Sequence, residues 1–62
     1  MFNKNYEYGE LINHKEKGFI FITEDDEKQI DEDLLIKAMN RLGEEGWELV
    51  ISDEKVGFIF KK

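Results

Sequence analysis

Most of the side chains in this chain that could do chemistry are carboxylates, and one stretch concentrates them. Residues 24–33 read EDDEKQIDED and carry seven acids and one Lys, a net charge of −6. The whole 62-residue chain has the same net charge, so the remaining residues are electrically balanced. Clustered carboxylates can bind Ca²⁺, mimic a phosphate backbone or attract a basic protein surface. The candidate residues are Glu24, Asp25, Asp26, Glu27, Asp31, Glu32 and Asp33.

The spacing of these acids argues against a metal site. An EF-hand loop needs a Gly at its sixth position and a bidentate Glu at its twelfth, and neither is present. The chain has one His and no Cys, so it lacks the ligands of a structural zinc site. We therefore expect no metal and no cofactor. Two interpretations of the acidic stretch remain, a solvated loop leading into a helix and a partner-binding patch.

The sequence also lacks the parts of a catalytic site. His14 stands beside lysines in a predicted turn, and the aliphatic hydroxyls, Thr23 and Ser52, lie at strand ends, so no activated nucleophile is apparent. There is no Gly-rich phosphate loop and no nucleophile elbow. The sole Arg, Arg41, is spaced to pair with Glu45 on a helix surface. We expect that the protein is not an enzyme and that His14 is an exposed loop residue.

Aromatic residues form the second candidate surface. Six Tyr and Phe residues lie on predicted strands: Tyr6, Tyr8, Phe19, Phe21, Phe58 and Phe60. Such a set can be an oligomer interface, part of the core, or a platform on which a ligand ring stacks. The basic groove that accompanies nucleic-acid platforms is missing, so direct nucleic-acid binding is not expected. Trp47 shares a strand face with Leu49 and Ile51, which favours a core position.

Hydrophobic periodicity predicts one α+β domain over residues 1–62. The expected strands span Asn5–Asn13, Gly18–Thr23, Trp47–Ser52 and Gly57–Lys61, and Glu24–Gln29 is expected to be a loop. Asp31 is the predicted N-cap of a helix whose apolar stripe is Leu34, Leu35, Ala38, Met39 and Leu42. Gly46 is the predicted C-cap, with Gly43 as the alternative.

These elements follow the order ββαββ, which predicts a four-stranded antiparallel sheet with one helix on one face. Two spatial orders, 2-1-3-4 and 1-2-4-3, keep every strand pair antiparallel if the helix returns the chain. One helix covers only one side of a sheet, yet the strand Gly18–Thr23 is apolar on both sides. A chain of this length buries little surface and has no disulfide, so we expect a homo-oligomer, most simply a two-fold dimer.

The segment Arg41–Val50, together with Tyr6-Glu7-Tyr8 and Phe60-Lys61-Lys62, resembles a family of small bacterial and phage proteins. Members carry a Tyr-rich first strand and an L-G-x-E-G-W-E-L-V helix-to-strand signature. The family has no assigned function, so the resemblance implies a fold and a fairly small cytosolic protein, and no activity or catalytic residues carry over from it. The lack of Cys, of a basic leader and of a long apolar segment likewise favours a cytoplasmic protein that does not enter membranes.

We therefore expect a small acidic interaction protein of phage or bacterial origin. It would bind and modulate a larger host protein through a basic surface, such as a nucleic-acid-handling site. The alternative is an oligomer that sequesters a small nucleotide-like molecule between its subunits.

Overall fold

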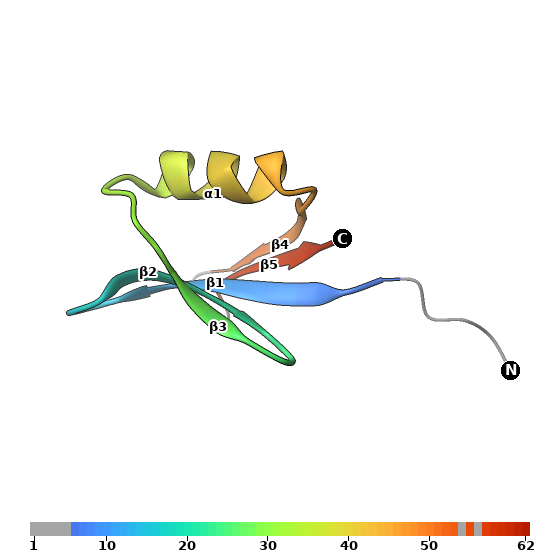
Figure 1. Cartoon of the computed structure of the whole chain (residues 1–62), viewed down its shortest axis with the longest axis horizontal. Coiled ribbons are helices and arrows are strands. Elements are labelled where there is room, and N and C mark those ends of the chain that lie inside the picture. The colour runs from blue at the N-terminus through green and yellow to red at the C-terminus, as the bar shows by residue number, and fades with distance from the viewer. Residues whose placement is uncertain (1–5, 54, 56) are drawn as a thin grey trace, which may run out of the picture.

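A five-stranded antiparallel sheet carries a single helix across one face in the computed structural model (Figure 1). The structure describes residues 6–53, 55 and 57–62. The elements are β1 (Tyr8–His14), β2 (Gly18–Thr23), β3 (Glu27–Ile30), α1 (Leu35–Glu44), β4 (Glu48–Asp53) and β5 (Gly57–Lys61). The prediction of four strands in a ββαββ order is therefore wrong, because β3 is a strand where a loop was expected.

The additional strand changes the direction of everything that follows it. β3 pairs antiparallel with β2, so it runs in the same direction as β1. The helix then returns the chain, and β4 also runs parallel to β1 instead of parallel to β2. This leaves β5 free to pair antiparallel with β1 at the centre of the sheet, in the order β3-β2-β1-β5-β4. Both predicted strand orders assumed one strand fewer before the helix, and both are wrong.

The C-terminal end of α1 follows the sequence prediction. Gly46 has a φ of 99°, the left-handed conformation that glycine adopts without a steric penalty. Its N–H donates to the Gly43 carbonyl, and the Trp47 N–H donates to the Leu42 carbonyl, each at 3.0 Å. This pair of bonds is a Schellman motif, and Leu42 and Trp47 make its apolar contact within the core.

The N-terminal end of α1 differs from the prediction. The helix begins at Leu35, and its N-cap is Leu34, which makes no side-chain capping bond. Asp31 is not the cap, because Ile30 ends β3 inside the core and the chain needs the following residues to reach the helix axis. Leu34 was expected in the apolar stripe and is instead 52% exposed. Ala38 and Leu42 are buried as predicted, with Leu35 and Met39 packed against the core.

Strand register assigns each sheet residue to one of two faces, because residues directly opposite each other on neighbouring strands point the same way. The face under α1 supplies the core: Leu11, Phe19, Phe21, Ile30 and Phe60 are buried with Ala38, Leu42 and Trp47. We call the other side the open face, since no described element covers it in Figure 1. Its central side chains are mainly isoleucines.

Gly9 is required by the ring of Phe21. A Cβ built at Gly9 overlaps the Phe21 ring, which lies over this position of β1. Phe21 packs edge-on against Trp47 at 4.8 Å between ring centroids and against Phe60 at 5.9 Å. The ring is therefore held between Gly9, Trp47 and Phe60, and its position depends on a missing side chain at Gly9.

We expect Gly9→Ala to lower the free energy of unfolding by about 1–3 kcal/mol, the usual effect of overpacking a filled core. Urea unfolding followed by Trp47 fluorescence measures this change. Gly43→Ala is the matched control, because its Cβ meets nothing within 4 Å and lies on the helix. It should raise stability by up to about 1 kcal/mol. Equal stability of the two variants would contradict the proposed packing.

Candidate functional site

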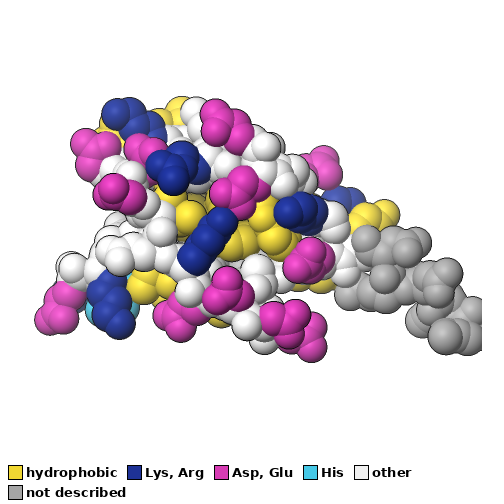
Figure 2. Space-filling view, in the orientation of Figure 1, with side chains coloured by type: hydrophobic (Ala, Val, Ile, Leu, Met, Phe, Trp, Pro, Cys, Tyr) yellow, Lys and Arg dark blue, Asp and Glu magenta, His cyan; other side chains and the backbone are white. Residues whose placement is uncertain are grey.

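The acidic stretch begins at a tight turn between β2 and β3. The Thr23 N–H donates to the Asp26 carbonyl at 2.8 Å, which closes the hairpin around Glu24 and Asp25. The Thr23 hydroxyl donates to the same carbonyl at 3.3 Å, and an Asp26 carboxylate oxygen accepts from the Glu27 N–H at 2.7 Å. We call residues 24–27 the acidic turn. All four side chains are exposed, and acidic side chains gather at this tip in Figure 2.

The rest of the acidic stretch is separated from this turn by β3 and is largely neutralised. A Glu32 carboxylate oxygen accepts from Arg41 at 2.8 Å, and Asp33 lies 3.8 Å from Lys37 one helical turn later. In contrast, no acid of the acidic turn makes an ion pair with another described residue. The predicted seven-residue patch is therefore two groups, and the acidic turn is the one with unbalanced charge.

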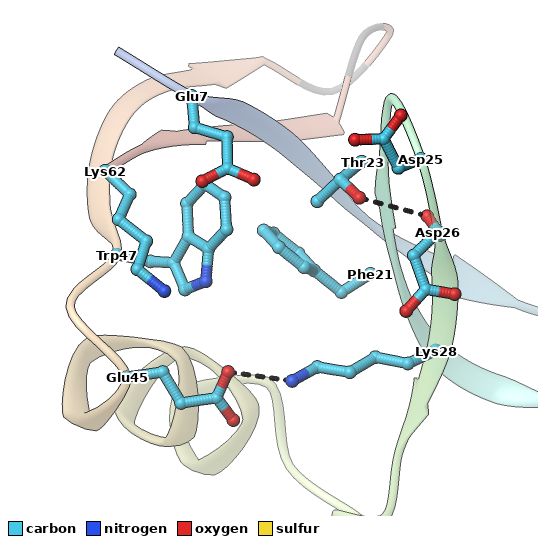
Figure 3. Close-up of a pocket in the computed structure, with 9 residues that line it drawn as sticks. All are labelled: Glu7, Phe21, Thr23, Asp25, Asp26, Lys28, Glu45, Trp47 and Lys62. Carbon is cyan, nitrogen blue, oxygen red and sulfur yellow. Dashed lines mark hydrogen bonds and ion pairs between the residues drawn. The ribbon is translucent and has the colours of Figure 1, made fainter. Parts of the chain in front are cut away.

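A cleft of about 270 Å³ lies beside the acidic turn, between β2, β3, the end of α1 and the last residues of the chain. Figure 3 shows the rings of Phe21 and Trp47 at its centre. Asp25 and Asp26 border it on one side and Glu7 on another. The remaining lining residues are Thr23, Lys28, Glu45 and Lys62. Its charged groups are four carboxylates and two amines, so a cationic group is favoured over a phosphate.

One ion pair spans the cleft from the sheet to the helix. Lys28 lies on the helix side of β3, and its Nζ is 2.7 Å from a Glu45 carboxylate oxygen (Figure 3). The hydrogen bond from Lys28 lowers the pKa of the Glu45 carboxyl from its ordinary value of 4.5. Both side chains are 43% exposed, so solvent screens the pair and its contribution to stability is about 1 kcal/mol or less.

The second lysine of the cleft lies on the indole ring of Trp47. The Nζ of Lys62 is 5.1 Å from the ring centroid, within the range of a cation–π interaction. The ring is otherwise buried, as predicted, and packs edge-on against Phe21. The amine of Lys62 thus already lies against the aromatic wall of the cleft, and this wall accommodates a cationic group.

The structure does not bring the six strand aromatics together on one surface. Phe19, Phe21 and Phe60 are core residues beneath α1, with Phe58 packed against them. Tyr6 and Tyr8 lie on the opposite side of the sheet, with ring centroids 6.4 Å apart. The alternation was read correctly in β1, β2 and β5, but sequence alone did not say which side of each strand faces the helix. The prediction that Leu49 and Ile51 share a face is wrong, because a bulge in β4 between these residues places Leu49 opposite Phe60 and Ile51 opposite Ile59 on the open face.

Two predictions about single polar residues need correction. Arg41 pairs with Glu32, not with Glu45, and this hydrogen bond raises the pKa of the Arg41 guanidinium. His14 is the last residue of β1 and is half-buried, and its Nδ1 accepts from the N–H groups of Glu16 and Lys17 at 3.1 Å. His14 therefore shapes the β1–β2 turn.

Neither a metal site nor a membrane-spanning helix is found in the described part of the chain. Among residues 6–53, 55 and 57–62, no group of three or more His, Cys, Asp or Glu side chains is arranged to hold a metal ion. No helix in the same residues is long and apolar enough to cross a membrane.

Comparisons with protein-family models, curated protein sequences and solved structures gave no match. The family resemblance of the Trp47 segment therefore stays a prediction, and the functional argument depends on the geometry of this chain.

Sequence reasoning missed both the β2–β3 hairpin and the cleft beside it. Asp, Glu and Lys are poor strand formers, so residues 24–29 resembled a loop. The available signal was β2 itself, because a strand that is apolar on both sides needs a pairing partner along each edge. The placement of Lys28 and Ile30 two residues apart on the helix side of β3 follows the strand period.

We expect the Lys28–Glu45 pair to make stability depend on pH in the acidic range. Because the folded-state pKa of Glu45 is lowered, the pair stabilises the protein above about pH 4.5 and loses this effect as the pH falls. In Lys28→Gln the Glu45 pKa should return toward its ordinary value, as measured by ¹³C NMR titration of the carboxyl carbons. Lys37→Gln is the control, since Lys37 pairs with Asp33. An unchanged Glu45 titration in Lys28→Gln would contradict this assignment.

Proposed function

We propose that this protein is a small, non-enzymatic interaction protein that binds a basic surface of a larger partner protein. The observation that carries the proposal is the acidic turn, where four adjacent exposed carboxylates lack ion pairs within the described chain. Charges that are neutralised internally contribute little to attracting a partner, whereas an unbalanced acidic tip steers a basic surface toward it. A basic nucleic-acid-handling surface of a host protein has the matching charge.

The cleft beside the acidic turn also favours a basic partner. Its rim adds Glu7 to Asp25 and Asp26, and its aromatic wall already accommodates the amine of Lys62. An Arg or Lys side chain from a partner can reach these carboxylates, because Glu7, Asp25 and Asp26 are exposed. Asp25 and Asp26 of the acidic turn and the rim of the cleft therefore form one surface suited to basic side chains.

The alternative function, sequestration of a nucleotide-like molecule between subunits, has less support. It depended on a shared aromatic surface, and four of the six aromatics lie in or against the core. The cleft carries more carboxylates than amines, which repels a phosphate group. A thermal-shift screen with nucleotides addresses this alternative directly, because a ligand that binds the folded state raises Tm.

We expect the double variant Glu24→Gln/Asp25→Asn to reduce capture of a basic partner by about tenfold at low salt, because two steering charges are lost. Asp26 is left unchanged because its carboxylate accepts from the Glu27 N–H. The measurement is affinity capture from the protein's own cells, followed by binding of the purified partner at increasing salt.

Glu16→Gln/Glu44→Gln is the matched control for this experiment. It removes the same number of charges from exposed positions outside the acidic turn and should bind the partner nearly as the unaltered protein does. Equal loss in both double variants, or binding that is insensitive to salt, would reject the acidic turn as the partner-binding surface.

A further inference from the structure

The open face of the sheet has a row of side chains that crosses all five strands. The register places Glu27 opposite Ile22, Ile22 opposite Glu10, Glu10 opposite Ile59, and Ile59 opposite Ile51. The neighbouring row places Ile20 opposite Ile12 and Gln29. The open face is thus an apolar surface of isoleucines with one carboxylate, that of Glu10, on its central strand.

Glu10 has an unusual environment for a carboxylate. Its cross-strand neighbours are Ile22 and Ile59, Ile12 lies two residues farther along β1, and its own side chain is half-buried. The three ion pairs made between described residues all use other groups. A carboxylate in this position stays favourable in water, but an apolar cover over it costs several kcal/mol unless the cover brings a cation.

The charges around Glu10 argue against a second copy of this chain as the cover. On the described open face the register places four acids, at Glu10, Glu27, Glu48 and Asp53, and one Lys, Lys61. A second lysine, Lys55, lines a hollow with Glu10 and Asp53 at the β4–β5 connection, so the acids still outnumber the bases. The Nζ of Lys61 already lies 4.5 Å from the ring centroid of Tyr6. Two such faces brought together would oppose acid to acid, and each copy carries a net charge of −6.

A helix is the element that best fits this surface. The interior strands of the sheet, β2, β1 and β5, are paired on both sides, so a partner lying on the face meets side chains and not backbone groups. The opposite face of the same sheet is covered by the single helix α1 (Figure 1). A second helix on the open face would give a three-layer arrangement with both faces of the sheet covered.

We propose that the open face binds an amphipathic helix of a partner protein, with an Arg or Lys in its apolar stripe that pairs with Glu10. The isoleucines at positions 12, 22, 51 and 59, which are half-buried or exposed, pack against the apolar side chains of that helix. The inference rests on the proposed function in that the partner is basic, but it concerns a surface on the other side of β2 from the cleft.

The test uses a synthetic amphipathic helical peptide with a Leu and Ile stripe and one central Arg, titrated into ¹⁵N-labelled protein and followed by NMR. We expect the largest shifts at Ile12, Ile22 and Ile59. Glu10→Gln should weaken binding by at least about tenfold, because the peptide Arg then lacks its partner. A peptide with Gln in place of Arg should bind Glu10→Gln more tightly than the unaltered protein, in which it would cover a carboxylate without a cation. Glu16→Gln, which removes one charge from the β1–β2 turn, is the matched control and should change binding less than about twofold.

Three results would overturn the inference. Equal binding of the Arg peptide to Glu10→Gln and to the unaltered protein would show that Glu10 selects no cation. A concentration-dependent dimer by sedimentation equilibrium, with the same isoleucines at its interface, would make a second copy the occupant. Absence of NMR chemical-shift changes on the open face would show that the peptide does not bind there and that this face is exposed to solvent. The double variant Glu24→Gln/Asp25→Asn separates the two proposals, since it should impair partner capture but leave peptide binding at the open face unchanged.

Discussion

The packing of Phe21 against Gly9, Trp47 and Phe60 is the contact on which the rest of the structure depends. It joins the first two strands to the last strand and to Trp47, which lies between α1 and β4. The Schellman motif at Gly46 sets the direction in which Trp47 enters this contact, because the backbone bonds of the motif fix the path from α1 into β4. Local backbone geometry and long-range aromatic packing therefore agree at this point, which is characteristic of sequences that specify one fold.

The same contact also organises the charged surface. Because Phe21 faces the helix, the neighbouring position on β3, Lys28, faces it as well and reaches Glu45 at the end of α1. Glu24, Asp25 and Asp26 of the acidic turn then extend beyond the last pair of this hairpin, Ile22 and Glu27, where no described base lies within ion-pair distance. The cleft is bounded by these elements, so its acidic rim is a consequence of the hairpin and not of the acidic sequence alone.

The opposite side of the sheet shows how a small protein keeps an apolar surface in water. Isoleucines on adjacent strands shield one another, and Ile20 is buried although no described element lies above it. Glu10 interrupts this surface at its centre, and charges that point from a sheet face oppose association with a like surface. The two faces of the sheet thus differ in chemistry, with phenylalanines under α1 and isoleucines around a carboxylate on the open face.

The sequence by itself determined four of the five residues of the helix stripe, the left-handed Gly46, two strands to the residue and the concentration of negative charge, because these depend on local periodicity and backbone conformation. The tertiary structure decided the remainder. The pairing of β3 with β2 overrode the weak strand propensity of Glu27, Lys28 and Gln29. This additional strand reversed the direction in which the chain enters the helix and β4, and it therefore changed the order of the strands in the sheet. Which face of each strand meets α1, and which acids find internal bases, are likewise long-range facts. They depend on strand register and on ion-pair distances. Both are set by residues that are distant in the sequence and meet only in the folded protein.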